Sequence, residues 1–246
     1  MLRRAPSLTD QVKAHIKDLI VQGQFADSRV PPEMELAELL GVSRTTVREA
    51  LSRLEMEGTI SRRQGSGTFV NDPVLQIRSR LDEIWSYEAV LRAHGFTPST
   101  RVLEAYALTV GDEGLPKNII NELSLAADEQ VLFTSKLFLE DDVPVILAHN
   151  YLPMRLLAEP YTAEDLERPV YDFLEMFSHR RLAYYLSEIM PIAADSELAE
   201  ALLIAPGTPL IAFDEIGYDD DNVPILKAMS YFRDDLLRFR ILRRRV

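Results

Sequence analysis

The first 60 residues of the chain contain three runs of apolar residues at helical spacing. The first run consists of Leu8, Val12, Ile16, Leu19 and Ile20, and a glycine follows it as a stop. The second run begins after a proline that favours a helix start, and its inward positions are Leu36, Leu39 and Leu40. Gly41 follows as a helix-ending residue. Two short helices are therefore expected before residue 42.

A third helix is expected after Ser43, which is a good N-cap, and it ends at Gly58. Val47, Leu51 and Leu54 form its apolar stripe. The turn between the second and third helices is the glycine-containing "GVS". Two helices joined by a short glycine-containing turn are typical of a helix-turn-helix.

The segment "GTISRRQGSGTFV" predicts a short hairpin, with strands at residues 59–63 and 68–70. Gly65 and Gly67 in its tip permit positive φ angles and leave backbone N–H groups free to approach a phosphate or the minor groove. Arg62 and Arg63 add positive charge beside the tip. We interpret this hairpin as a wing.

The pattern changes after residue 77 from helices alone to strands separated by short helices. Six strands are expected, at residues 101–110, 130–140, 144–153, 182–194, 209–218 and 224–232. The charged turns "EDDV" and "DDDNV" each join two of them as antiparallel hairpins. Helical segments are expected near residues 78–93, 117–125, 171–177 and 195–203. This alternation predicts an α+β domain with a mainly antiparallel sheet.

Turn and breaker residues at 71–77 separate these two patterns. We therefore expect a DNA-binding domain at residues 1–70, a linker at 71–77 and a second domain at 78–246.

The two parts of the chain differ in net charge. Residues 1–72 carry ten basic and ten acidic residues, so the formal charge of −12 belongs to the rest of the chain. Phosphate binding depends on local positive charge, and the acidic total does not exclude it. The chain has no cysteine, which excludes disulfides and cysteine-ligated zinc. No signal-peptide pattern or membrane-length apolar run is present, so a cytoplasmic protein is expected.

The start of the third helix carries the residues suited to reading DNA. Arg44 and Arg48 are four residues apart and project from one side of the helix, away from its apolar stripe. Arginine pairs bidentately with guanine, and residues at this end of the second helix of the motif reach base edges. Thr45 and Thr46 can bind phosphates or contact a thymine methyl group.

Residues 8–70 resemble the winged helix-turn-helix of GntR-type transcription regulators. The resemblance rests on "LAELLGVSRTTVREALSRLEMEG" and "RRQGSGTFV". It implies DNA contacts from Ser43, Arg44, Thr45, Thr46, Arg48, Gln64 and Gly65. Where the family often has an arginine after the glutamate that opens the second helix, this chain has Met34, so its operator is expected to deviate from the usual one.

The second part resembles the UTRA domain of the HutC-like branch of that family, which shares its fold with chorismate lyase. The resemblance rests on "YLP", "VYDFLE", "DSELAEALLIAPGTPLI" and "YFRDD". It implies a domain that dimerises, binds a small-molecule effector and changes the spacing of the two DNA-binding domains. It also implies a homodimer on a pseudo-palindromic operator, acting as a repressor.

Relatives in this branch often bind phosphorylated sugars, but here several polar positions of that site are apolar or lack a hydroxyl. The changed positions hold Lys136, Phe138, Ala148, Pro169, Leu226 and Phe232, whereas Tyr171 keeps the tyrosine of the family pattern. We take Lys136, Phe138, Tyr171, Leu226 and Phe232 as the candidate effector residues. A buried anion without partners is costly, so a more apolar or aromatic effector is expected, with Lys136 left to hold a single anionic group. The alternative is a domain that has lost its ligand and only dimerises.

No catalytic or metal-binding motif is present, and the four histidines have no pair at ligand spacing. We therefore expect no enzyme, no cofactor and no metal site. Two rival hypotheses stay open: an enzyme on the chorismate-lyase-like fold, and a GntR-type regulator with an all-helical effector domain.

Overall fold

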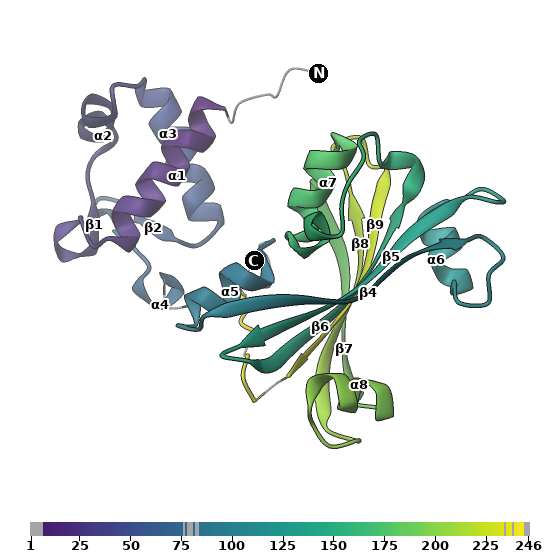
Figure 1. Cartoon of the computed structure of the whole chain (residues 1–246). Helices are drawn as coiled ribbons and strands as arrows, with labels where there is room; N and C mark the ends of the chain where they lie inside the picture. The colour runs from purple at the N-terminus through teal and green to yellow at the C-terminus, as the bar shows by residue number, and fades with distance from the viewer. Residues whose placement is uncertain are drawn as a thin grey trace. The chain divides into compact units, whose positions relative to one another are not determined.

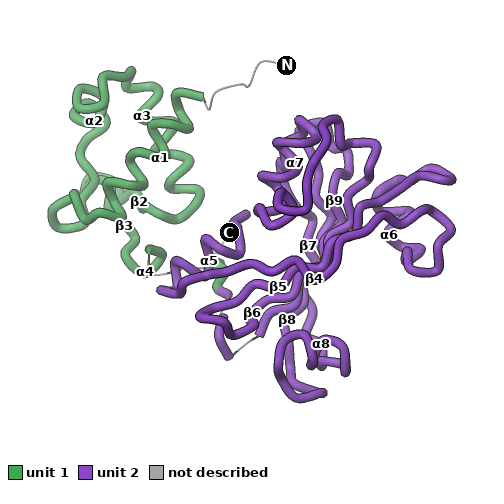
Figure 2. The backbone as a smooth tube through the Cα atoms, in the orientation of Figure 1, with its two compact units in different colours: residues 1–80, 240–246 green, residues 81–239 purple. Residues whose placement is uncertain are grey.

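The computed structural model describes residues 7–75, 77, 81, 84–233, 235–237 and 239–243. The chain divides into two compact units, residues 1–80 with 240–246, and residues 81–239 (Figure 2). The predicted domain limits at residues 70 and 77 stay a prediction. The predicted linker contains the one-turn helix α4 (Asp72–Leu75), and its residue Gln76 lies outside the described residues.

Three helices form the core of the first unit, as predicted: α1 (Leu8–Val21), α2 (Glu33–Leu40) and α3 (Arg44–Met56) (Figure 1). Lys13 Nζ lies 2.7 Å from Glu57 Oε1 and links α1 to the end of α3. The prediction that Leu39 faces inward is wrong, because its side chain is 67% exposed. Leu36, Ala37 and Leu40 define the stripe facing the core, and at 3.6 residues per turn Leu39 lies about 100° from its centre.

The predicted wing is a hairpin of β2 (Ile60–Arg63) and β3 (Gly67–Val70). A third, two-residue strand, β1 (Arg29–Val30), completes the sheet in the order β1-β3-β2. A 3-10 turn, η1 (Ala26–Ser28), precedes β1. Sequence reasoning missed β1 because two residues are too few to show an alternating pattern.

The second unit contains one antiparallel six-stranded sheet in the order β4-β5-β6-β9-β8-β7. Its strands are β4 (Pro98–Thr109), β5 (Gln130–Glu140), β6 (Val143–Pro153), β7 (Tyr184–Ala193), β8 (Pro209–Tyr218) and β9 (Pro224–Arg233). All six predicted strands and both predicted hairpins are confirmed. The rival all-helical second domain is therefore excluded.

Four α-helices described in this unit cover the two faces of the sheet. Helices α5 (Tyr87–Ala93) and α7 (Val170–Ser178) pack on the face that carries Phe138, Ala148 and Ala228. Helices α6 (Lys117–Glu122) and α8 (Ser196–Leu202) pack on the opposite face (Figure 1). Two 3-10 turns, η2 (Met154–Leu156) and η3 (Glu164–Glu167), lie between β6 and α7.

Residues 78–80, 82 and 83 of the helix predicted over 78–93 lie outside the described residues, and helix α5 covers only the second half of that range. It begins only after Ser86, whose Oγ caps it by accepting a hydrogen bond from Ala89 N at 2.9 Å. The apolar residues Leu81, Ile84 and Trp85 precede the helix and are not part of it. Their spacing suggested a helix, but the serine cap starts the helix later. Within the part of the chain that the structure describes, no helix is long and apolar enough to cross a membrane.

Candidate functional site

The N-terminus of α3 presents the predicted DNA-reading side chains. Ser43 Oγ accepts a hydrogen bond from Thr46 N at 3.1 Å and lies 2.8 Å from Thr46 Oγ1, so these two side chains hold the first turn. Arg44, Thr45 and Arg48 are exposed. The next residue after Thr46, Val47, is fully buried, so this helix turns one face to the core and the arginines away from it. This is the arrangement that base reading by a helix-turn-helix requires.

Arg62 is held by the protein itself. Its Nε lies 3.5 Å from Glu55 Oε2, and one of its terminal nitrogens lies 3.9 Å from Glu33 Oε1. The same guanidinium is 3.4 Å from the carbonyl oxygen of Arg48. Arg62 therefore braces the wing against α2 and α3, and its predicted contribution to DNA binding stays a prediction.

The tip of the wing agrees with the sequence interpretation. Gly65 and Gly67 have φ angles of +76° and +116°, which other residues rarely adopt. Arg29 donates a hydrogen bond to the carbonyl oxygen of Ser66 at 3.1 Å and supports the turn. Arg63 places its guanidinium carbon 4.8 Å from the ring centroid of Phe69, and Gln64 is exposed at the tip.

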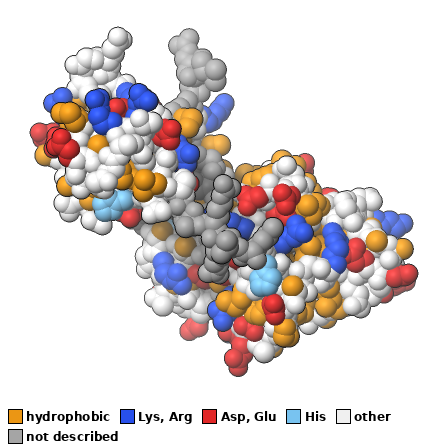
Figure 3. Space-filling view, turned by 90° about the horizontal axis from the view of Figure 1, so that it is seen from above, with side chains coloured by type: hydrophobic (Ala, Val, Ile, Leu, Met, Phe, Trp, Pro, Cys, Tyr) orange, Lys and Arg blue, Asp and Glu red, His pale blue; other side chains and the backbone are white. Residues whose placement is uncertain are grey.

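Met34, the residue at the position where relatives often have arginine, is 58% exposed on α2. Its side chain is thus available at the surface but carries no charge. In Figure 3 basic and acidic side chains are interspersed on the visible face of the molecule.

A cavity of about 680 Å³ lies inside the second unit, on the sheet face that α5 and α7 cover. Two rows of neighbouring residues cross that face from β5 through β6, β9 and β8 to β7. Most residues of both rows line the cavity. The first row is Thr134, Asn150, Ala228, Glu215 and Ser187. The second row is Lys136, Ala148, Ser230, Phe213 and Ile189. The cavity is hollow because the two central strands contribute alanines, Ala148 and Ala228, to its floor.

Three of the five candidate effector residues line this cavity: Lys136, Phe138 and Tyr171. Leu226 and Phe232 do not line it, although both lie on the same face of β9 as Ala228. Both are fully buried in hydrophobic clusters. The ring of Tyr87 lies against Phe232, with centroids 5.4 Å apart, and covers it.

Lys136 is a buried cation at one end of the cavity. Only 3% of the residue is exposed, and its Nζ donates a hydrogen bond to the carbonyl oxygen of Arg168 at 2.7 Å. Burial lowers the pKa of Lys136 to about 8, although Glu88 and Glu167 oppose that shift. Lys136 therefore remains mostly protonated at neutral pH.

Sequence reasoning missed the carboxylate at the other end, Glu215. The residue is 9% exposed, and Ser187 Oγ donates a hydrogen bond to its Oε1 at 2.5 Å. Burial raises the pKa of the Glu215 carboxyl group, and the bond from Ser187 partly offsets the rise. The alternation of Phe213 and Glu215 along β8 was visible in the sequence, but the neighbouring strands were not.

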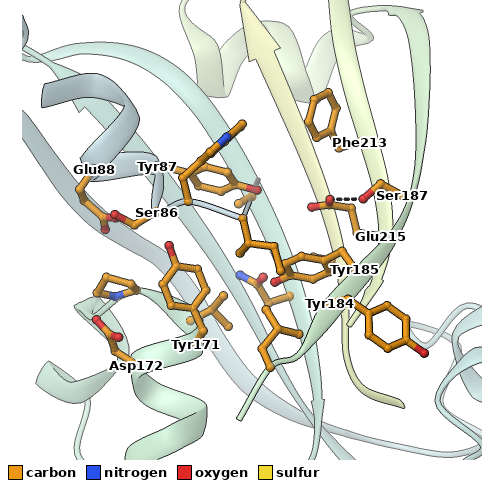
Figure 4. A pocket seen from close by; sticks show the side chains of 18 of the residues that line it. Ser86, Tyr87, Glu88, Tyr171, Asp172, Tyr184, Tyr185, Ser187, Phe213 and Glu215 are labelled. Atoms are coloured by element: carbon orange, nitrogen blue, oxygen red, sulfur yellow. Dashed lines mark hydrogen bonds between the residues drawn. The ribbon is translucent and has the colours of Figure 1, made fainter. Parts of the chain in front are cut away.

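Aromatic side chains surround the space next to Glu215. In Figure 4, Tyr87, Tyr171 and Tyr185 lie around the same space as Glu215, whereas Tyr184 points away from it. The hydroxyl of Tyr87 is 2.6 Å from Ser230 Oγ. An alanine Cβ at position 217 would lie 3.1 Å from the ring of Tyr185, so Gly217 leaves room for that ring.

Among the described residues, no group of three or more potential ligand side chains is arranged to hold a metal ion. The lining of the cavity has charged side chains at its ends and aromatic side chains along its walls.

Comparisons with known proteins agree with this two-part organisation. The pattern of bacterial regulatory proteins of the gntR family matches residues 8–70, and that of the UTRA domain matches residues 93–238. The HTH-type transcriptional repressor NagR of Bacillus subtilis (strain 168) is 28% identical, over 93% of this chain and 91% of its own length. The HTH-type transcriptional regulator Rv0792c of Mycobacterium tuberculosis is 30% identical, over 96% of this chain and 85% of its own.

Solved structures show the same fold. PhnF from Mycobacterium smegmatis superimposes with a TM-score of 0.59 at 26% identity, covering 95% of this chain and 99% of that one. The possible transcriptional regulator YydK from Bacillus subtilis has a TM-score of 0.76 at 16% identity, covering 96% and 99% of the two chains. The named relatives are transcription regulators and not enzymes. The chain therefore belongs to the GntR family of bacterial regulatory proteins, as a transcription regulator with a helix-turn-helix domain and a UTRA domain.

Proposed function

We propose that this regulator is a homodimeric repressor that binds a pseudo-palindromic operator in the cytoplasm and responds to a small-molecule effector. The observation that carries the proposal is the capped start of α3, where Arg44, Thr45 and Arg48 are exposed opposite a buried stripe. One such helix per protomer reads one half-site, and two-fold symmetry makes the whole site palindromic.

Exposed apolar side chains on the two edge strands of the sheet support the dimer. Leu103 and Tyr106 on β4 are 42% and 47% exposed, and Leu186 on β7 is 62% exposed. Exposed apolar side chains on an edge strand are available to contact a second copy of the chain. Sedimentation equilibrium of the full chain measures the mass directly, and a monomer at micromolar concentration contradicts the dimer.

The effector part of the proposal rests on the cavity in the second unit. Its volume of about 680 Å³ suits a small organic molecule. The open cavity argues against the alternative that the domain only dimerises. Phe138, Ala148 and Pro169 line it at positions where related sites hold polar groups, so we propose an effector more apolar than a phosphosugar. Among the described residues that line the cavity, Lys136 is the buried cation, and we expect an anionic group of the effector, if it has one, to bind there.

The test begins by selecting the DNA that the full chain binds from a random pool. Arg44→Ala and Arg48→Ala are then compared with the unaltered protein on that operator at matched salt. Each substitution removes a bidentate base contact worth about 1–3 kcal/mol, so binding weakens by roughly tenfold or more while the oligomeric state is unchanged.

Arg53→Gln is the matched control, because Arg53 also lies on α3 but pairs with Asp10 on α1. It removes one positive charge from the same helix without touching the start of α3. We expect it to leave operator affinity near that of the unaltered protein. Equal losses in all three variants mean that the helix acts through its charge alone, and normal binding by Arg44→Ala and Arg48→Ala refutes the assignment.

A further inference from the structure

Carboxylates outnumber basic groups around the cavity. Its lining includes four acidic residues, Glu88, Asp172, Glu175 and Glu215, against two basic ones, Lys136 and Arg181. Three of these six are buried: Glu88, Lys136 and Glu215. The buried part of the lining therefore carries two carboxylates and one ammonium group, one positive charge short of balance.

Lys136 has polar partners within the protein. Its Nζ donates to the Arg168 carbonyl oxygen, and Glu88 is the carboxylate that most favours its charged form. Glu88 accepts a hydrogen bond from Thr100 Oγ1 at 3.2 Å, while its second oxygen, Oε2, is buried without a hydrogen-bond partner. Lys136 and Glu88 thus lie at one end of the cavity, where their opposite charges attract each other without a direct salt bridge.

Glu215 has no such partner at the other end. The salt bridges found among the described residues do not include it, and its one side-chain hydrogen bond comes from the neutral Ser187. The charge of Lys227 acts on Glu215, but the Lys227 side chain lies on the opposite face of the sheet. There it forms salt bridges with Asp214 and Glu122. Lys136 is three strand spacings away, or about 14 Å across the sheet.

The side chains next to Glu215 are aromatic. The rings of Tyr87, Tyr185 and Phe213 surround it, and Tyr171 lies on the far side of the same space (Figure 4). The faces of aromatic rings attract cations, and a carboxylate beside such rings forms the recognition site typical of an organic ammonium group. Without a counter-ion, burial favours the neutral form of Glu215, whereas a cationic ligand would favour its carboxylate and gain a charged partner.

We propose that the effector carries a cationic nitrogen, an amine or guanidinium group, that binds Glu215 between the rings of Tyr87 and Tyr185. The inference rests on the proposed function of this cavity as the effector site. A phosphorylated sugar fits poorly, because its charge would face the same two buried carboxylates. An aromatic or aliphatic amine fills the apolar middle over Ala148 and Ala228 and balances Glu215.

Three probes of nearly equal shape test the charge of the ligand. Tyramine is cationic, 4-ethylphenol is neutral and 4-hydroxyphenylacetate is anionic; glucose 6-phosphate is the phosphosugar comparison. Binding to the full chain is measured by calorimetry and by the unfolding temperature of the second unit. We expect tyramine at millimolar concentration to bind and stabilise, with the neutral and anionic probes at least tenfold weaker.

Two variants connect that binding to the site. Glu215→Gln keeps the shape of the side chain and removes its charge, and it is expected to weaken tyramine binding at least tenfold. Tyr185→Leu removes one ring and weakens it by a smaller factor. Glu188→Gln is the matched control, since Glu188 is a neighbouring exposed carboxylate on β7 that does not line the cavity. It leaves the affinity unchanged.

The outcomes separate the two proposals. Absent tyramine binding, equal binding of the three probes, or stronger binding of the anion or of glucose 6-phosphate overturns the cationic effector. If one of those other probes binds the cavity and releases the operator, the effector function still stands. If tyramine binds through Glu215 but no ligand of the cavity alters operator binding, the cation site stands and the proposed effector function falls.

Discussion

Filling the hollow of the cavity floor should stabilise the protein. Ala228 sits at the centre of the floor on β9, buried among the groups that line the cavity. The change Ala228→Leu adds three carbon atoms that point into existing space. At about 0.8 kcal/mol for each buried methylene-sized group, complete burial would contribute about 2.4 kcal/mol.

The realised gain is smaller because the walls of the cavity are partly polar and the leucine must lose side-chain freedom. We expect a gain of about 1 kcal/mol in the free energy of unfolding, seen as a rise in Tm of about 2–4 °C. Urea unfolding of the full chain, followed by circular dichroism, measures the change independently of temperature. The filled variant should keep operator binding and lose any response to an effector.

Ala212→Leu is the matched control for this experiment. Ala212 is an equally buried alanine on β8, 1% exposed, and it does not line the cavity. Three added carbons there meet packed neighbours, which typically destabilises a protein by about 1–3 kcal/mol. If Ala228→Leu destabilises the chain as much as Ala212→Leu does, the space over β9 is not open in solution, and the effector argument loses its basis.

Three further predictions concern single positions. Ser43→Ala removes the cap of α3 and lowers the free energy of unfolding of the first unit by about 1 kcal/mol, whereas Ser43→Asp keeps the cap; a larger loss for the aspartate would contradict this. Met34→Arg restores a positive group on exposed α2 and tightens operator binding several-fold in a mobility-shift assay, while Met34→Gln does not. The pKa of Lys136 is about 8 in the folded protein and near its ordinary value of 10.5 in the unfolded chain. Between these two pH values the unfolded chain therefore binds more protons than the folded protein. Stability from this group therefore rises with pH over that interval, and Lys136→Met abolishes the rise in denaturant titrations; an unchanged pH profile would argue against a buried ammonium group.

The first unit was largely predictable because its signals are local. The cap, the glycine stops and the stripe of α3 all lie within a few residues of the feature that they determine. Arg62 is the exception. Arg62 lies on β2, but its carboxylate partners, Glu33 and Glu55, come from helices α2 and α3, and sequence spacing could not show that they meet it.

The second unit was predictable in its strands but not in its site. Alternation identified the residues that share a face, yet the order β5-β6-β9-β8 pairs residues as far apart as Ile146 and Phe232, which no local pattern reveals. Leu226 and Phe232 show the limit clearly. Both lie on the face of β9 that forms the cavity floor, but other side chains cover them. Glu215 was overlooked because its role depends on Ser187 and Tyr185 from the next strand.

The salt bridges of Arg62 within the protein affect how the regulator binds DNA outside its operator. A guanidinium already neutralised by Glu33 and Glu55 displaces few counterions when the wing meets a phosphate. Counterion release supplies most of the affinity for DNA of random sequence. Because Arg62 is paired within the protein, we expect complexes with such DNA to be shorter-lived. Together with the balanced charge of residues 1–72, this pairing leaves recognition to the arginines that we predict to read bases, Arg44 and Arg48. Residence on the operator should then depend weakly on ionic strength for a protein of this type.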